Sequence, residues 1–129
     1  MKEFLIIIVS LVLVFTGASV SQAYLDESSK HLIGELEVLR EEIKKAQSNE
    51  ENNSEELANQ ISEKWEETED KWSLIIMHEE LDLIELSLIA MKIGIEEEEY
   101  ERSMEELEKS KFLLQHITEK EKFKLKNVF

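Results

Sequence analysis

Apolar residues recur at steps of three and four along most of this chain, and no proline interrupts them. This spacing places apolar side chains on one face of an α-helix, because one turn takes about 3.6 residues. Proline is the residue that most strongly breaks helices, and the chain contains only three glycines. The abundance of Leu, Ile, Glu and Lys adds helical propensity. The sequence therefore predicts an all-α protein.

After the first 23 residues, the spacing predicts three helices, at about 25–47, 54–93 and 96–120. The polar stretch 48–56 separates the first two helices, and Asn53 is expected to cap the second, with Glu56 completing a capping box. Gly94 is expected to adopt the left-handed conformation that ends the second helix. Residues 121–129 contain several large apolar side chains and are expected to fold back onto the other helices. These elements predict an antiparallel three-helix bundle with a long central helix.

The length of the central helix leaves alternatives open. Residues 54–93 would make a helix of about 60 Å, against about 35 Å for the first helix. If residues 1–23 stay in a membrane, the central helix must bend near 66–71, giving a four-helix arrangement, or the chain must hinge near 23–28. Beyond Trp72 the central helix carries two apolar stripes, one through Leu81 and Ile84 and one through Leu83 and Leu86. A helix that is apolar on two sides is expected to be buried by two neighbours.

The first 23 residues form a separate targeting segment. Phe4 to Phe15 is apolar apart from Ser10, and small residues follow it, which is typical of a secretory signal peptide cleaved after Ala23. Phe4 to Val20 is also about 25 Å of helix, near the lower limit for a membrane span. An uncleaved signal anchor therefore stays open. Both interpretations place residues 24–129 outside the cytoplasm as one helical domain, either secreted or anchored.

The net charge of −15 and the absence of cysteine restrict the classes of function. An acidic surface argues against binding to nucleic acid and against adsorption to anionic lipid, since both need a basic face. It is compatible with solubility and favours cationic partners, including divalent ions. Without cysteine the chain has no disulfide, no thiolate metal ligand and no thiol nucleophile.

His78, Asp82 and Glu85 are the main candidate site, because residues at i, i+4 and i+7 share one helix face. His78-Glu79-x-x-Asp82 differs from a zinc-peptidase motif by an aspartate in place of the second histidine. The other two histidines lie in other predicted helices without a matching partner, so we expect no enzyme. Three interpretations remain. The residues could form a polar network that takes hydrogen bonds from a lysine or arginine of another helix, such as Arg40 or Arg102, or they could bind a divalent cation or a partner.

Trp65 and Trp72 are one heptad apart and would lie on the same side of the central helix. Such a pair could form a platform for a ligand, but anchoring a hydrophobic core is the commoner role. No glycine-rich phosphate loop and no nucleophilic triad accompanies them, and the sequence predicts no cofactor.

The stretch from Trp72 onward, with Trp72-x5-His78-x-Glu80-Leu81-Asp82-x2-Glu85 and the ending Glu119-Lys120-Glu121-Lys122-Phe123-Lys124-Leu125-Lys126-Asn127-Val128-Phe129, carries a resemblance. It resembles an uncharacterised, domain-of-unknown-function family of small exported or membrane-anchored helical proteins from Gram-positive bacteria. The resemblance implies a location and a fold but no activity. It draws attention to Trp72, His78, Asp82 and Glu85, and also to Asn127, as a polar or interaction cluster.

Together these patterns predict a non-enzymatic, extracytoplasmic helical module that acts as an accessory or interaction protein at the outer face of the membrane. Its expected partner is a membrane protein, or another copy of the chain in a coiled coil. The alternative is a module that binds a divalent cation through His78, Asp82 and Glu85.

Overall fold

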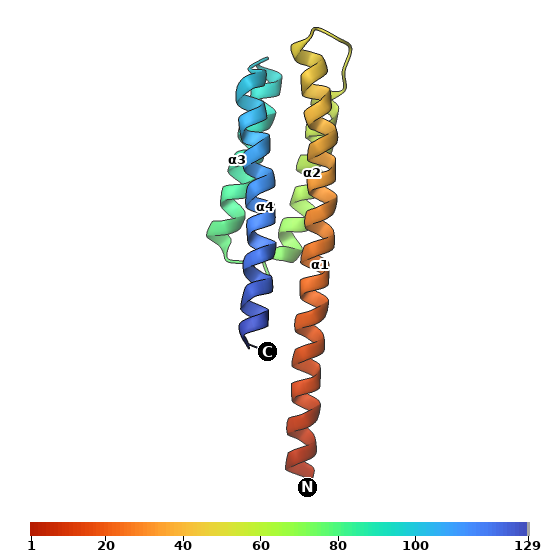
Figure 1. Cartoon of the computed structure of the whole chain (residues 1–129), viewed down its shortest axis with the longest axis vertical. Helices are drawn as coiled ribbons and strands as arrows, with labels where there is room; N and C mark the ends of the chain where they lie inside the picture. The colour runs from red at the N-terminus through yellow and green to blue at the C-terminus, as the bar shows by residue number, and fades with distance from the viewer. Residues whose placement is uncertain (129) are drawn as a thin grey trace.

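The structure, a computed structural model, describes residues 1–128 of the chain and the side chains up to Asn127. The described residues form four α-helices and no strand: α1 (Lys2–Gln47), α2 (Ser54–Trp72), α3 (His78–Glu96) and α4 (Tyr100–Val128). Figure 1 shows the four helices side by side, with α1 extending far beyond the others at its N-terminal end. The all-α prediction is confirmed, and the four-helix arrangement is the one that forms.

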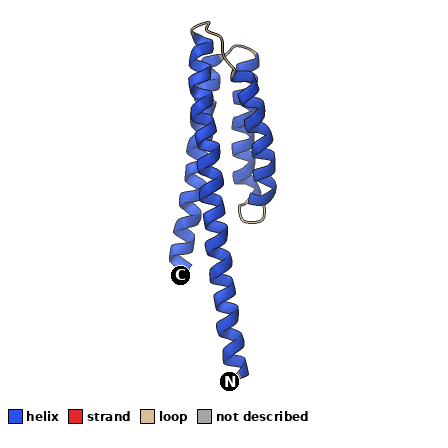
Figure 2. Ribbon diagram, turned by 90° about the vertical axis from the view of Figure 1, so that its right-hand side faces the viewer, coloured by secondary structure: helices blue, strands red, loops and turns tan. Residues whose placement is uncertain are grey.

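Each helix packs against two neighbours, in the order α1, α2, α3, α4, and α4 closes the ring against α1. In Figure 2, α2 and α3 form a hairpin that stands beside the pair made by α1 and α4. One face of α1 packs into the core, and its buried apolar residues are Leu25, Leu32, Leu36, Leu39, Ile43 and Ala46. The core is completed from the other three helices by buried residues that include Ile61, Trp65, Trp72, Leu81, Ile84, Leu88, Met91, Ile95, Leu107, Leu114 and Ile117.

α1 runs without interruption from the apolar N-terminal segment into the bundle. Residues 1–17 are exposed, and the first buried side chain is that of Leu25. The hinge that we considered near residues 23–28 is absent from the structure, because this part of the chain is regular helix. The N-terminal segment and the first bundle helix are therefore one rod.

The predicted central helix is two helices that reverse direction at residues 73–77. The carbonyl oxygen of Trp72 accepts hydrogen bonds from the backbone N–H groups of Ile75 (2.9 Å) and Ile76 (2.8 Å). Met77 then adopts an extended conformation, with φ −64° and ψ 141°, and starts α3. The buried side chains of Trp72 and Ile76 fix the turn against the core. The prediction of a continuous helix is wrong, and the break lies just beyond the bend that we considered at 66–71.

α3 buries only one of its two apolar stripes. Leu81 and Ile84 are buried, whereas Leu83 is 50% exposed and Leu86 is 63% exposed. The prediction that two neighbours cover both stripes is wrong, because α2 and α4 both pack on the same side of α3. The opposite side of the helix faces outward.

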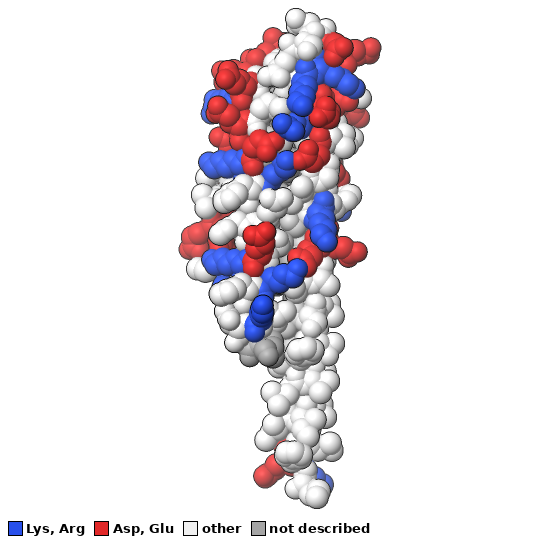
Figure 3. All heavy atoms as spheres, viewed as in Figure 1, with Lys and Arg blue, Asp and Glu red and all other residues white. Residues whose placement is uncertain are grey.

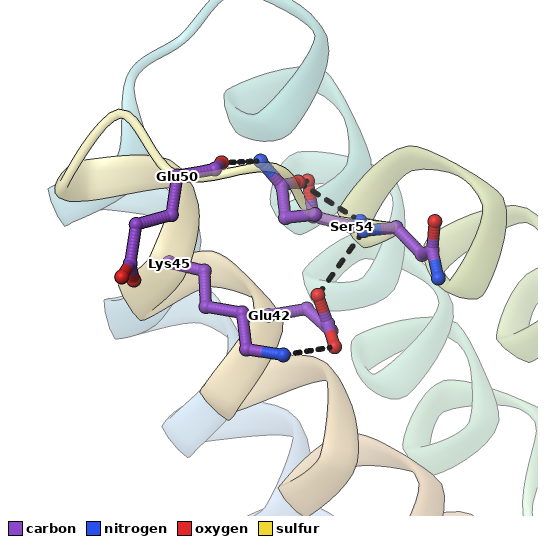
Figure 4. A network of polar contacts seen from close by, with 6 residues as sticks. Glu42, Lys45, Glu50 and Ser54 are labelled. Atoms are coloured by element: carbon purple, nitrogen blue, oxygen red, sulfur yellow. Dashed lines mark hydrogen bonds and ion pairs between the residues drawn. The ribbon is translucent and has the colours of Figure 1, made fainter.

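The turn between α1 and α2 is held by a polar network, which Figure 4 shows. The predicted capping box does not form, because the side chain of Asn53 makes no capping hydrogen bond. Instead Oε2 of Glu42 accepts from the backbone N–H of Asn53 (3.1 Å), and Oδ1 of Asn52 accepts from that of Ser54 (3.1 Å). The hydrogen bond from Asn53 lowers the pKa of Glu42, with a further contribution from Lys45.

The turn between α3 and α4 uses Glu98, not Gly94, as its left-handed residue. Glu98 has a φ of 59°, while Gly94 is helical. The backbone N–H of Glu98 donates to the carbonyl of Ile95 (3.2 Å), and that of Glu99 donates to the carbonyl of Gly94 (2.7 Å). This is the hydrogen-bond pattern of a Schellman motif. The prediction for Gly94 is wrong, and its role is close packing against Ser103 of α4.

Residues 121–128 continue α4 and do not fold back, so that prediction is wrong too. The segment has no helix stop signal, and its Glu, Lys and Leu residues favour helix. Phe123 is 65% exposed, whereas Leu125 is half-buried. The predicted contacts of Val128 and Phe129 lie outside the described side chains.

Candidate functional site

The α2–α3 hairpin brings three carboxylates together on the outside of the bundle. Glu69 lies near the end of α2, and Asp82 and Glu85 lie in the first half of α3. One oxygen atom from each of the three lies within 4.8 Å of the others. Asp82 is exposed, while Glu69 and Glu85 are half-buried. We call these three residues the carboxylate cluster.

The surroundings of Glu69 in the carboxylate cluster disfavour its ionised form. The pKa of Glu69 is raised, first by its burial and then by the charges of Glu85 and Asp82, while His78 acts in the opposite direction. A group with a raised pKa in the folded state binds a proton more readily than it does in the unfolded chain.

The structure brings only part of the predicted site together. His78 is the exposed first residue of α3, close enough to influence Glu69 electrostatically but not part of the carboxylate cluster. Trp72 is buried in the core, where its indole Nε1 donates to Oγ of Ser28 at 2.8 Å. Asn127 is exposed in the last turn of α4, and no described hydrogen bond or ion pair joins it to the carboxylate cluster.

The arginines that we considered as donors to this site are engaged elsewhere. Nε of Arg40 lies 3.2 Å from Glu108, and Nη1 of Arg102 lies 3.4 Å from Glu99. Within the described residues, no lysine or arginine forms an ion pair with the carboxylate cluster. Three oxygen ligands without a basic partner suit a hard divalent cation such as Ca²⁺ or Mn²⁺ better than Zn²⁺, which prefers nitrogen and sulfur ligands.

A second feature is an apolar surface on the outer side of α3. We call it the α3 outer face, and it consists of Leu83 (50% exposed), Leu86 (63%), Ile89 (48%) and Ile93 (39%). A groove of about 320 Å³ between α2 and α3 runs alongside it and is lined partly by Ile89 and Ile93. Contiguous exposed apolar side chains are typical of surfaces that bind another protein or a membrane.

A family model described as a domain of unknown function, DUF4363, matches residues 19–128. The chain belongs to the DUF4363 family. The match covers all of α2, α3 and α4 and the bundle part of α1, and it omits most of the apolar N-terminal segment. Family membership thus confirms the resemblance to a domain of unknown function. No curated protein and no solved structure shows significant similarity to this DUF4363 protein.

Sequence reasoning identified two of the three carboxylates in the cluster of this DUF4363 protein. The proximity of Asp82 and Glu85 could be predicted from helical spacing because both residues lie on one helix. Glu69 was missed because it precedes Asp82 by several helical turns in the predicted continuous helix, and only the reversal at 73–77 brings it close.

Proposed function

We propose that this DUF4363 protein is a non-enzymatic interaction module, held at the outer face of the membrane by residues 1–23, and that its partner is an integral membrane protein. Residues 24–129 form the extracytoplasmic domain in this proposal. An exported protein of a Gram-positive bacterium, as the sequence resemblance implies, would have this arrangement.

The observation that carries the proposal is the N-terminal part of α1. Of the described helices, α1 alone contains an 18-residue window apolar enough to cross a membrane, with a mean hydropathy of 2.5, and none of that window is buried by the rest of the chain. A row of exposed Leu, Ile, Val and Phe side chains would be costly in water. A lipid bilayer would remove this cost, and a signal peptide has the same composition.

The α3 outer face supports the interaction role. The helices of the bundle run along α1 in Figure 1. If α1 crosses a membrane, the α3 outer face would therefore lie outside the membrane and roughly perpendicular to its surface. Its side chains Leu83, Leu86 and Ile93 are spaced at three and seven residues, which is the pattern that one helix presents to another. A helix of a neighbouring membrane protein would match this face. If a second copy of the chain covered it instead, sedimentation would show a mass that rises with concentration.

Introducing a charge into the N-terminal segment tests the membrane location. Leu11→Arg is expected to disfavour insertion of α1 by about 2.5 to 3.5 kcal/mol, the range measured for arginine at the centre of a span. The unchanged chain should remain with membranes after alkaline extraction, and Leu11→Arg should be released. Val38→Arg is the matched control, because Val38 is an exposed apolar residue of the same helix (56%) but lies within the bundle.

The same samples decide between an anchor and a signal peptide. Mass spectrometry of the mature chain should find Met1 with a membrane location, whereas a new N-terminus at Tyr24 outside the cell would refute anchoring by residues 1–23. An intact chain that stays in the soluble cytoplasmic fraction would refute the proposal. A hydrolytic activity that disappears in His78→Ala would refute its non-enzymatic part.

A second candidate function, the binding of a divalent cation, is favoured by the carboxylate cluster. The three oxygens within 4.8 Å of one another form an incomplete shell that water, or His78, would complete. Calorimetric titration with Ca²⁺, Mn²⁺ and Zn²⁺ should then give saturable heat that Asp82→Asn abolishes. Glu108→Gln is the control, because Glu108 is an exposed carboxylate paired with Arg40 at a distance of 3.2 Å.

Without a cation the carboxylate cluster should destabilise the fold, and its pH dependence follows from the raised pKa of Glu69. Its contribution to stability is greatest at low pH, where Glu69 is protonated, and falls as the pH rises through the unfolded and then the folded pKa. Glu69→Gln should therefore raise the free energy of unfolding near neutral pH by about 0.5 kcal/mol, as expected for relief of like-charge pairs, and have no such effect in acid. Saturation with an ion that binds there should reverse the sign, whereas equal stability of both proteins at every pH would show that the carboxylates do not interact.

A further inference from the structure

The last turns of α4 differ in charge from the rest of this acidic protein. Residues 120–126 contain four of the fifteen basic residues of the chain, at Lys120, Lys122, Lys124 and Lys126. No acidic residue follows Glu121. The three lysines after it are exposed, with side-chain exposures of 69% at Lys122 and 52% at Lys124. The C-terminal end of α4 is thus a basic tip on a molecule with a net charge of −15.

This basic tip lies beside the point where α1 leaves the bundle. Nε2 of Gln22 donates to the carbonyl oxygen of Thr118 at 3.5 Å, and Nζ of Lys122 lies 3.9 Å from Asp26. Because α4 runs antiparallel to α1, the residues after Lys122 descend towards Ala18 and the apolar segment. Figure 1 shows the C-terminus at this level, and Figure 3 shows basic side chains at the end of the bundle from which the uncharged part of α1 projects.

The α2–α3 turn places apolar side chains at the same end. Leu74 is 87% exposed and Ile75 is 37% exposed, which is unusual for a turn, since turns in water mostly carry polar residues. Leu74 and Ile75 line a groove of about 440 Å³ together with Ala18 of α1 and with Lys124 and Leu125 of α4. Phe123, which is 65% exposed, adds an aromatic ring to the basic tip. Apolar and basic side chains therefore meet around the base of the α1 segment.

We propose that the α2–α3 turn (residues 73–77) and the last turns of α4 (residues 120–127) form a contact with the membrane surface that binds anionic phospholipid headgroups. The proposal rests on the proposed function, in which α1 holds the chain in the bilayer. Lysines next to apolar and aromatic side chains suit the boundary between headgroups and acyl chains, where the ammonium groups reach the phosphates and the rings and alkyl groups enter the apolar layer.

The contact would orient the bundle on the membrane. The total charge argues against adsorption to anionic lipid, and Asp26 and Glu121 lie beside Lys122 and Lys124. After Glu121, however, the last turns of α4 carry lysines and no carboxylate side chain. An anionic surface would attract the end that carries Lys122, Lys124 and Lys126 and repel the remainder of the bundle. The α3 outer face would consequently stay upright and accessible to a partner in the same membrane.

A single fluorescent label tests this contact. The chain has no cysteine, so Asn127→Cys gives the full-length protein one attachment site for an environment-sensitive fluorophore in the last turn of α4. The labelled protein is placed in vesicles of phosphatidylcholine, with or without phosphatidylglycerol, and quenched with acrylamide, which is uncharged. We expect quenching to fall by about twofold when phosphatidylglycerol is present. The anionic surface attracts the lysines, which brings the label against the lipid and shields it from acrylamide.

Two sets of substitutions test which side chains cause the change in quenching. Combining Lys122→Gln, Lys124→Gln and Lys126→Gln should remove the dependence on phosphatidylglycerol. The matched control, Lys44→Gln with Lys45→Gln, changes exposed lysines at the opposite end of the bundle and should leave the dependence intact. Leu74→Ser with Phe123→Ser replaces exposed side chains, so it should fold normally by circular dichroism and increase quenching in both kinds of vesicle.

Vesicle flotation separates failure of this inference from failure of the proposed function. Protein that does not float with vesicles after alkaline treatment would refute anchoring by α1, and with it both proposals. Protein that floats, but whose label responds neither to phosphatidylglycerol nor to the lysine substitutions, would refute the lipid contact alone. The basic tip would then be a candidate binding surface for an acidic segment of a protein partner.

Discussion

Replacing Trp72 with alanine is expected to lower the free energy of unfolding by about 4 kcal/mol, within the range for tryptophan truncation in a core. The side chain is fully buried, and its ring meets that of Trp65 edge-on, with centroids 5.8 Å apart and an angle of 84° between the planes. It ends α2 and bonds to Ser28 of α1, so the substitution would leave a cavity where three parts of the chain meet. Urea denaturation followed by far-UV circular dichroism measures the loss.

Two further substitutions separate packing from hydrogen bonding. Trp72→Phe keeps most of the ring contact but loses the hydrogen bond to Ser28, and should cost about 1 to 2 kcal/mol. Phe112→Ala removes a ring that is 63% exposed and should change stability by less than about 0.5 kcal/mol. If Trp72→Ala cost no more than Phe112→Ala, the tryptophan pair would not anchor the core.

The helical spacing predicted burial correctly where a helix has one apolar stripe. In α1, residues such as Leu32, Leu36 and Ile43 are buried as expected, and in α2 the same holds for Ile61 and Trp65. On an amphipathic helix the polar residues define the outside, so the period of the pattern fixes which side chains turn inward.

The same reasoning failed in α3, where apolar residues lie on both sides. Leu83 and Leu86 look like core residues in the sequence, yet they are exposed in the folded chain. Apolar composition indicates that a surface avoids water, but not whether another helix of the same chain, a partner or a membrane covers it. The turn at 73–77 was missed for a related reason, because it contains neither proline nor glycine and depends on the tertiary contacts of Trp72 and Ile76.

The candidate site illustrates the difference between local and tertiary information. Asp82 and Glu85 share a helix, so their proximity could be predicted from spacing alone. Glu69 joins them only through the hairpin, and His78 is placed at its start and outside the carboxylate cluster. The basic tip was overlooked for a further reason. Total charge describes a whole chain, whereas the effect of Lys122, Lys124 and Lys126 depends on their position at one end of the bundle.

Gly94→Ala should lower the free energy of unfolding by about 1 to 2 kcal/mol, although alanine is the better helix former. A Cβ atom at this position would lie 3.0 Å from Cβ of Ser103 and 3.1 Å from the carbonyl oxygen of Glu99. The backbone N–H of Glu99 donates to the carbonyl oxygen of Gly94 itself at 2.7 Å, so the first turn of α4 cannot move away from α3 without losing this hydrogen bond. Chemical denaturation again provides the measurement.

Gly34→Ala is the matched control, because Gly34 also lies inside a helix but has no atom within 4 Å of its added Cβ. Here only the helix propensity changes, and the free energy of unfolding should rise by up to about 1 kcal/mol. The two identical substitutions should therefore have opposite signs. If Gly94→Ala stabilised the protein as Gly34→Ala does, α3 and α4 would not approach each other closely at this turn.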